Sequence, residues 1–294
     1  MTPRILKAER VLDARAELGE GARWDARTSS LLWVDILRGE LHRFDPASGR
    51  DVVRAVGRHI GAVAPRKRGG WVAAVREGFV TLHEDGREER LASPYADRPE
   101  LRFNDGRADR AGRFWADSLH YDHSAGKAAL FRLDADGSAR PMVEGLWLGN
   151  GLDWSPDDRF FYLVDTLHHR VDVFDFDLAT GELSARRPFL DVPKDQGHPD
   201  GLTVDSDGCL WVALFGGGGV QRYTPDGRLA ARVEVPGVEQ ITSCGFGGTA
   251  LDTLYVTTAR ENLRAEALAR QPHAGGLFAV RAGVRGQPTA AFAG

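Results

Sequence analysis

The sequence has little of what marks disulfide-stapled, membrane-spanning or nucleic-acid-binding proteins. Its 294 residues include only two cysteines, Cys209 and Cys244, too few for a disulfide framework, so we expect a reducing compartment, the cytoplasm. No apolar run approaches the ~18 residues of a membrane span, and Met1 to Leu18 mixes charged with apolar residues, unlike a secretory signal. With 38 basic and 42 acidic side chains and no basic cluster, nucleic acid is not an expected partner either.

Methionine and helix-forming stretches are also scarce. Two methionines against 35 glycines indicate many turns and few long helices. The one helical candidate is short, Glu261 to Arg270, and Pro272 ends it. The chain has no Gly-x-Ser-x-Gly motif, so the sequence offers no candidate nucleophile for serine-hydrolase chemistry.

Glycine, which is abundant, recurs at a regular period. Six glycines are spaced by 40, 45, 45, 50 and 44 residues, a mean of 44.8: Gly21, Gly61, Gly106, Gly151, Gly201 and Gly245. Each precedes a short run rich in aromatic and β-branched residues, such as Leu31–Asp35 or Leu210–Ala213, which favours a strand. A unit of about 45 residues with four strands is typical of a propeller blade. We therefore predict an all-β, six-bladed β-propeller with four antiparallel strands per blade, a single domain over residues 1–294.

The ring also needs a closure. The run Leu277–Val280 lacks a following partner strand, whereas residues 8–16 precede the first repeat and are left over. We predict that this N-terminal strand completes the last blade, which joins the two termini and removes exposed sheet edges. The tryptophans Trp33, Trp71, Trp115 and Trp211 recur at one phase of the repeat and are expected to pack inside the blades.

Equivalent positions of propeller blades converge on the central channel, so the residues before the six glycines can be compared. They are Glu20, Ile60, Asp105, Asn150, Asp200 and Cys244. Any one of these polar–glycine pairs alone is typical of a plain turn. Four oxygen donors at one phase instead favour a cluster at the channel mouth. Carboxylate and amide oxygens with few thiols or imidazoles suit a hard or borderline divalent cation.

These segments resemble those of the senescence marker protein/gluconolactonase/regucalcin family, which comprises six-bladed, metal-dependent sugar lactonases. The resemblance runs along nearly the whole chain. The segments that carry it are Leu18–Gly21, Arg102–Gly106, Gly149–Asp157, Pro199–Leu202, Gly208–Ala213, Thr242–Gly248 and Gly275–Phe278. Each segment alone is weak evidence for the family, but the segments together, in this order and at blade spacing, are specific for it.

The resemblance implies both an activity and a site. It implies that Glu20, Asn150 and Asp200 bind one divalent metal ion (Ca²⁺, Zn²⁺, Mn²⁺, Mg²⁺ or Fe²⁺), with Asp200 also acting on water as the catalytic residue. Arg102 and Asn104 match the substrate-contacting pair of the family, and Asp122 falls where some relatives carry a substrate-facing Glu. The implied reaction opens a small-molecule sugar lactone, an aldonolactone, to its aldonic acid.

Other functions remain open at this point. One alternative is a related metal-dependent esterase or organophosphate hydrolase. Another is a non-enzymatic propeller, either a calcium-binding regulator or an interaction scaffold, although scaffolds usually lack a polar ligand cluster in the channel. We expect a monomer or a weak homo-oligomer. His120, His123 and Trp147 are expected near the rim of the pocket, without an assigned role.

Overall fold

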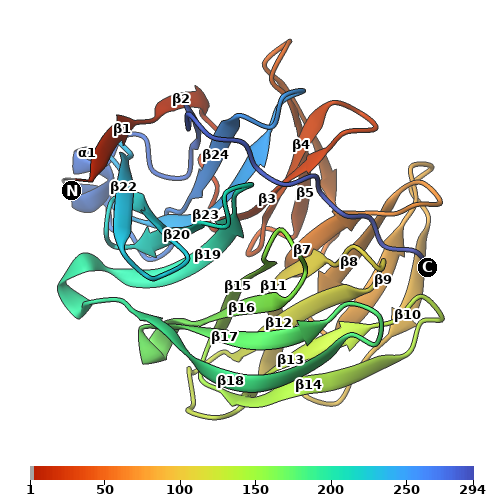
Figure 1. The fold of residues 1–294 in the computed structure, drawn as a ribbon. Coiled ribbons are helices and arrows are strands. Elements are labelled where there is room, and N and C mark those ends of the chain that lie inside the picture. Colours follow the sequence, from red (N-terminus) through yellow and green to blue (C-terminus); the bar gives the residue numbers. More distant parts are fainter. Residues whose placement is uncertain (1–2) are drawn as a thin grey trace.

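The computed structural model describes residues 3–294 and arranges six sheets in a ring (Figure 1). Each sheet is built on four antiparallel strands, which confirms the predicted six-bladed β-propeller. The innermost strands, β3, β7, β11, β15, β19 and β23, contact one another in that order, and β23 returns to β3. The ring therefore closes between the sixth and the first blade.

The first three blades follow one another without interruption along the chain. Blade 1 consists of β3 (Gly19–Asp25), β4 (Ser30–Asp35), β5 (Glu40–Asp45) and β6 (Arg50–Ala55). Blade 2 consists of β7 (Ile60–Pro65), β8 (Trp71–Val75), β9 (Gly78–Leu82) and β10 (Glu88–Ala92). Blade 3 consists of β11 (Leu101–Ala108), β12 (Phe114–His120), β13 (Ala128–Leu133) and β14 (Ala139–Leu146).

The other three blades include the closure. Blade 4 consists of β15 (Gly149–Trp154), β16 (Phe160–Asp165), β17 (Arg170–Asp177) and β18 (Glu182–Asp191). Blade 5 consists of β19 (His198–Val204), β20 (Leu210–Phe215), β21 (Gly219–Tyr223), β22 (Leu229–Glu234) and, added in parallel, β1 (Arg4–Lys7). Blade 6 consists of β23 (Ile241–Gly247), β24 (Thr253–Thr258), β25 (Leu277–Arg281) and β2 (Glu9–Leu12).

Helices are short, as the composition indicates. The α-helix α1 spans Ala265–Arg270, so the predicted helix over 261–270 forms only in its second half. Two single-turn 3₁₀ helices, η1 (Thr166–His168) and η2 (Lys194–Gln196), lie in connections of blades 4 and 5. No helix among residues 3–294 has the length and apolar character to cross a membrane.

The N-terminal strand closes the ring as predicted. β2 pairs antiparallel with β25, the third strand of blade 6. β1, which the sequence pattern did not indicate, extends the neighbouring blade by pairing in parallel with β22. Both pairings cover outer edges that would otherwise expose backbone N–H and C=O groups.

The C-terminal segment, residues 282–294, differs from the expected closure. It leaves β25 and crosses the end of the ring, so the N- and C-termini lie on opposite sides of the molecule (Figure 1). The amide of Gly286 donates to the carbonyl of Leu251 in blade 6, and that of Phe292 donates to the carbonyl of Pro65 in blade 2. The fully buried side chain of Phe292 then joins the hydrophobic cluster of blades 2 and 3.

Five of the six repeat glycines have a steric reason, whereas Gly21 has space around its Cβ position and instead adopts a φ of +66°. All six lie within the inner strands, where neighbouring blades approach closely around the axis. A Cβ atom on Gly245 would overlap the backbone oxygen of Ala22, and one on Gly151 would overlap the backbone nitrogen of Leu202. Only glycine permits this approach without moving a strand. The four tryptophans lie on the second strands β4, β8, β12 and β20 and are buried, as expected.

Candidate metal and substrate site

The three predicted metal ligands come to one end of the central channel. Glu20, Asn150 and Asp200 stand on β3, β15 and β19, each directly before its repeat glycine. The register against the second strand of each blade shifts at these positions, so the ladder is locally interrupted. Such a bulge re-aims a side chain, here away from the blade sheet. The three residues are only 4–5% exposed.

Hydrogen bonds fix the orientation of these side chains. Oε2 of Glu20 accepts from the amide of Gly21 at 3.1 Å. Nδ2 of Asn150 donates to Oγ1 of Thr166 at 3.2 Å, and Oδ1 accepts from the amide of Gly151 at 3.1 Å, which leaves one lone pair of Oδ1 for a ligand. Oδ1 of Asp200 is buried and has no hydrogen-bond partner among the described residues.

The electrostatic state of the two carboxylates reflects their crowding. Burial raises the pKa of Glu20 to about 8, and the charge of Asp105 contributes in the same direction. Burial also raises the pKa of Asp200 well above its usual range, and the charges of Glu20 and Asp105 raise it further. The buried site therefore favours a proton, or a cation in its place, on these carboxyls.

This arrangement fits a divalent cation. An orphaned carboxylate oxygen, a second buried carboxylate and an amide oxygen are hard donors, and a cation beside them would favour their ionised forms. Residues 3–294 contain no cluster of three His, Cys, Asp or Glu side chains suited to a metal. A metal at this place therefore needs the neutral oxygen of Asn150 as its third protein donor.

The predicted substrate pair lies beside this set, on β11. Nη1 of the buried Arg102 donates to Oδ1 of Asn104 at 2.6 Å and to the carbonyl of Phe103 at 3.1 Å. Nδ2 of Asn104 donates to the carbonyl of Gly149 at 2.9 Å, the residue before Asn150. Asn104 thus holds the Arg102 guanidinium and ties it to the ligand strand of blade 4.

The third predicted substrate residue, Asp122, lies apart from this cluster. It belongs to the connection after β12, and its side chain is 67% exposed. Its carboxylate accepts from the amide and hydroxyl of Ser124 and pairs with the imidazole of His120. The structure thus brings five of the six predicted residues together and leaves Asp122 on the outer rim.

Sequence reasoning missed three polar residues at the mouth. His59 precedes the apolar Ile60 in blade 2, Tyr121 follows β12, and Glu261 follows β24. A signal was present: because each inner strand begins at the mouth, each antiparallel second strand ends there. Residues just after the second strands therefore form the rim, a position that the repeat locates in all six blades.

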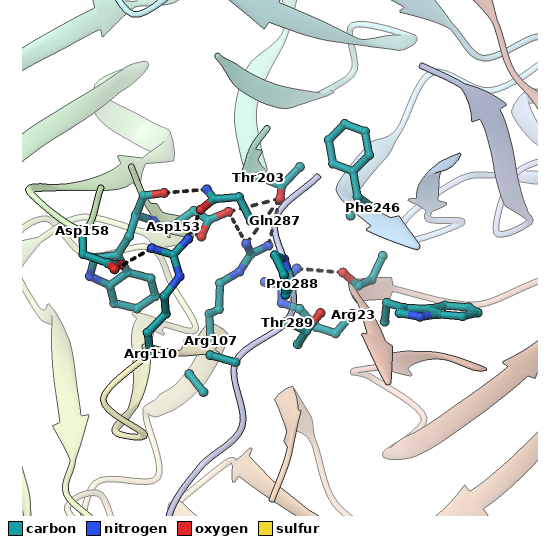
Figure 2. Close-up of a pocket in the computed structure, with 16 residues that line it drawn as sticks. Arg23, Arg107, Arg110, Asp153, Asp158, Thr203, Phe246, Gln287, Pro288 and Thr289 are labelled. Atoms are coloured by element: carbon teal, nitrogen blue, oxygen red, sulfur yellow. Dashed lines mark hydrogen bonds and ion pairs between the residues drawn. The ribbon is translucent and has the colours of Figure 1, made fainter. Parts of the chain in front are cut away.

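The opposite end of the channel is closed by the C-terminal segment. A small pocket of about 40 Å³ lies beneath this segment, lined by Arg23, Arg107, Asp153, Thr203 and Gln287 among others. Figure 2 shows Arg107 directed at Asp153 and Thr203, and Gln287 of the crossing segment above them. Nε2 of Gln287 also donates to the carbonyls of Trp154 and Val204. The segment is thereby bonded to blades 4 and 5 at this end of the ring.

The chain is similar to known proteins over nearly its whole length. Regucalcin of Danio rerio is 40% identical over 293 residues, which cover 98% of this chain and 99% of that protein. YvrE of Bacillus subtilis strain 168, provisionally named a sugar lactone lactonase, is 36% identical over 284 residues, covering 96% and 97%. The crystal structure of regucalcin from Agrobacterium tumefaciens strain C58, described as a calcium-binding protein, matches with a TM-score of 0.94 at 28% identity, covering 99% of both chains.

The family model described as the SMP-30/Gluconolactonase/LRE-like region matches residues 18–260. This range begins before Glu20 and ends just after β24, so it contains all six inner strands and every predicted ligand. The match confirms the resemblance that the repeat segments indicate. The chain is a sugar-lactonase-like propeller and belongs to the SMP-30/gluconolactonase/LRE-like family.

Proposed function

We propose that this protein is a metal-dependent hydrolase that opens aldonolactones to aldonic acids. The observation that carries the proposal is the buried set of Glu20, Asn150 and Asp200, with an unpartnered carboxylate oxygen, beside the guanidinium of Arg102. Three protein donors leave positions for water and substrate, the arrangement of a catalytic rather than a structural metal site. Family membership and the provisional lactonase name of the Bacillus subtilis relative support the same reaction.

The chemistry follows from the groups at the mouth. A bound divalent cation supplies Lewis-acid polarisation of the lactone carbonyl and makes water more acidic. Asp200 is the proposed base: one of its carboxylate oxygens would hold the cation, and the other takes the proton of water as the water oxygen bonds to the carbonyl carbon. Arg102 donates to the carbonyl oxygen as negative charge develops there. The ring C–O bond then breaks, and the proton held by Asp200 passes to the released ring oxygen.

The test is a hydrolysis assay with a pH indicator on aldonolactones and phenyl acetate. Each substrate is measured with chelator and with added Ca²⁺, Mn²⁺, Zn²⁺, Mg²⁺ or Fe²⁺. We expect turnover of the aldonolactone that chelator removes and one or more of these metals restores. Preferred turnover of phenyl acetate would instead assign the protein to the esterase alternative.

Variants connect this activity to the site. We expect Glu20→Gln and Asp200→Asn to lower kcat by at least about a hundredfold, because each removes a ligand charge and the second also removes the base. Asp191→Asn, an exposed carboxylate at the end of β18, is the matched control and should behave as wild type. Near-wild-type hydrolysis by both site variants, with the fold intact by circular dichroism, would contradict the assignment.

A calcium-binding regulator is the second candidate. It is favoured by the name of the Agrobacterium tumefaciens structure, a calcium-binding protein, and by the hard-oxygen donor set itself. Calcium binding by calorimetry, lost in Glu20→Gln, combined with no turnover of any lactone or ester under any metal, would support this function over the lactonase.

A further inference from the structure

Two rim residues face the channel mouth from opposite sides of the ring. Tyr121 follows β12 of blade 3, and Glu261 follows β24 of blade 6. Two blades lie between them in either direction around the ring of six. Both connections leave the ends of second strands, which lie beside the beginnings of the inner strands β11, which carries Arg102 and Asn104, and β23.

Tyr121 is held in a defined position. Its amide donates to the carbonyl of Glu100 at 2.9 Å, and its hydroxyl lies 2.7 Å from Nδ1 of His59. The two rings meet edge to face with centroids 5.8 Å apart. Although it is fixed in this way, the side chain is 41% exposed. A phenol hydroxyl has one donor and two acceptor sites, so His59 leaves capacity for a ligand.

Glu261 is anchored through its backbone and free at its side chain. The amide of Arg260 donates to the carbonyl of Glu17, and the side chain of Gln240 donates to the carbonyl of Glu261 at 3.0 Å. These bonds pin the loop to the segments that enter β3 and β23. Among the described residues, no hydrogen bond or ion pair engages the carboxylate of Glu261, which is only partly exposed.

Arg102 lies within the electrostatic reach of both residues. Burial lowers the pKa of Arg102, while Tyr121 and then Glu261 are the strongest groups acting to raise it. Glu261 also contributes to the raised pKa of Asp200, so its carboxylate lies within electrostatic range of the ligand set as well. The carboxylate of Glu261 and the hydroxyl of Tyr121 thus lie within electrostatic range of the Arg102 guanidinium. The other N–H groups of this guanidinium have no partner among residues 3–294.

Such a rim matches the chemistry of a substrate ring that carries several hydroxyl groups. Ring hydroxyls donate to carboxylates and can both donate to and accept from phenols. An ester without hydroxyls would displace water from Glu261 without replacing the lost hydrogen bonds. We propose that Glu261 and Tyr121 recognise substrate hydroxyls from opposite sides of the mouth and so set the preference for sugar lactones over unsubstituted lactones. This inference rests on the proposed lactonase function and adds its specificity determinants.

The decisive comparison uses two lactones with the same six-membered ring. D-glucono-1,5-lactone carries hydroxyls, and δ-valerolactone lacks them. We expect Glu261→Ala and Tyr121→Phe each to lower the ratio of kcat/KM for the two substrates by about tenfold or more, the effect of one lost hydrogen bond. Most of the change should fall on gluconolactone. Glu261→Gln, which keeps an acceptor oxygen, should retain part of the ratio.

Controls separate recognition from structural damage and from the proposed reaction. Glu266→Ala, an exposed carboxylate on α1, and Tyr255→Phe, a buried tyrosine of blade 6, should leave the ratio unchanged. Binding of 1,5-anhydro-D-glucitol, which has the hydroxyls but no ester, should weaken about tenfold in the two rim variants. If the wild type hydrolysed neither lactone, the proposed function would fail while this titration still decided the inference. Equal losses on both lactones with unchanged polyol affinity would overturn it.

Discussion

Arg23 on β3 and Asp105 on β11 form an ion pair across the central channel. Nη2 of Arg23 lies 3.0 Å from Oδ1 of Asp105, and the two side chains are 3% and 2% exposed. The pair connects the first and third blades, which are not neighbours in the ring. Asp105 raises the pKa of Glu20 and Arg23 lowers it, so Arg23 offsets part of the effect of Asp105 on the ligand set.

Removing one partner of this pair should be costly. Because a buried charge without a partner is poorly solvated, we expect Arg23→Leu to lower the free energy of unfolding by about 3–5 kcal/mol. The double variant Arg23→Leu/Asp105→Leu should lose less than the sum of the single variants, since neither charge is then left alone. Urea unfolding of the four proteins measures this coupling. Additive losses would show that the two charges do not interact.

The metal-free protein should lose stability as pH rises. The pKa of Glu20 is about 8 in the fold against an ordinary 4.5, so between these values the folded chain binds more protons than the unfolded chain. The free energy of unfolding then decreases with pH, by about 1.4 kcal/mol per pH unit for one proton. A saturating divalent cation should abolish this decrease because it stabilises the carboxylate form.

Thermal unfolding in chelator and in metal, followed from about pH 5 to about pH 8, tests this expectation. Glu20→Gln should make the chelator curve shallower, since it removes one of the two buried carboxylates with a raised pKa and leaves Asp200. A wild-type curve with the same slope as the Glu20→Gln curve would show that Glu20 is not the origin of the effect.

The close approach of blades 6 and 1 should not tolerate a side chain at Gly245. In Gly245→Ala the new Cβ meets the backbone oxygen of Ala22, and β23 or β3 has to move. Overpacking of this kind typically costs about 1–3 kcal/mol of unfolding free energy. As a control, Gly49→Ala introduces a Cβ into open space and incurs only the strain of its positive φ, roughly 1 kcal/mol. Equal losses in the two variants would contradict the packing argument.

The C-terminal segment should contribute to stability through Phe292. Its ring is fully buried between blades 2 and 3, so we expect Phe292→Ala to cost about 3–5 kcal/mol in chemical denaturation. Val53→Ala, at a half-exposed site on β6, serves as control and should change the free energy of unfolding by well under half as much. A loss in Phe292→Ala no larger than in the control would mean that the segment is only loosely attached.

Much of the fold was accessible from local pattern. Strand composition and the 44.8-residue spacing of the glycines predicted the blades and their number. The helix over 261–270 was predicted too long, because residues 261–264 form the turn at the mouth instead. Its Ala- and Leu-rich composition favoured helix, but the tertiary anchors of Arg260 and Glu261 decided the conformation.

The candidate site was accessible from the repeat only in part. Glu20, Asp105, Asn150 and Asp200 share a repeat position, and a repeat maps equal positions to equal places around a closed ring, but only the family resemblance singled out Glu20, Asn150 and Asp200 as the ligands. Asp122 carried no such constraint, and the structure places it on the exposed rim. Contacts between different positions of distant blades, such as Arg23 with Asp105, follow no period and cannot be read from spacing.

The order of residues alone therefore sets the blade repeat, the closing strand β2 and the residues that approach the axis, because strand preference and periodicity are local properties of the chain. Three features arise only when the ring has formed. They are the added strand β1, the crossing of residues 282–294, and the juxtaposition of Tyr121, Arg102 and Glu261 at the mouth. Each joins segments that are far apart in sequence, so its energy depends on the shape of the assembled surface.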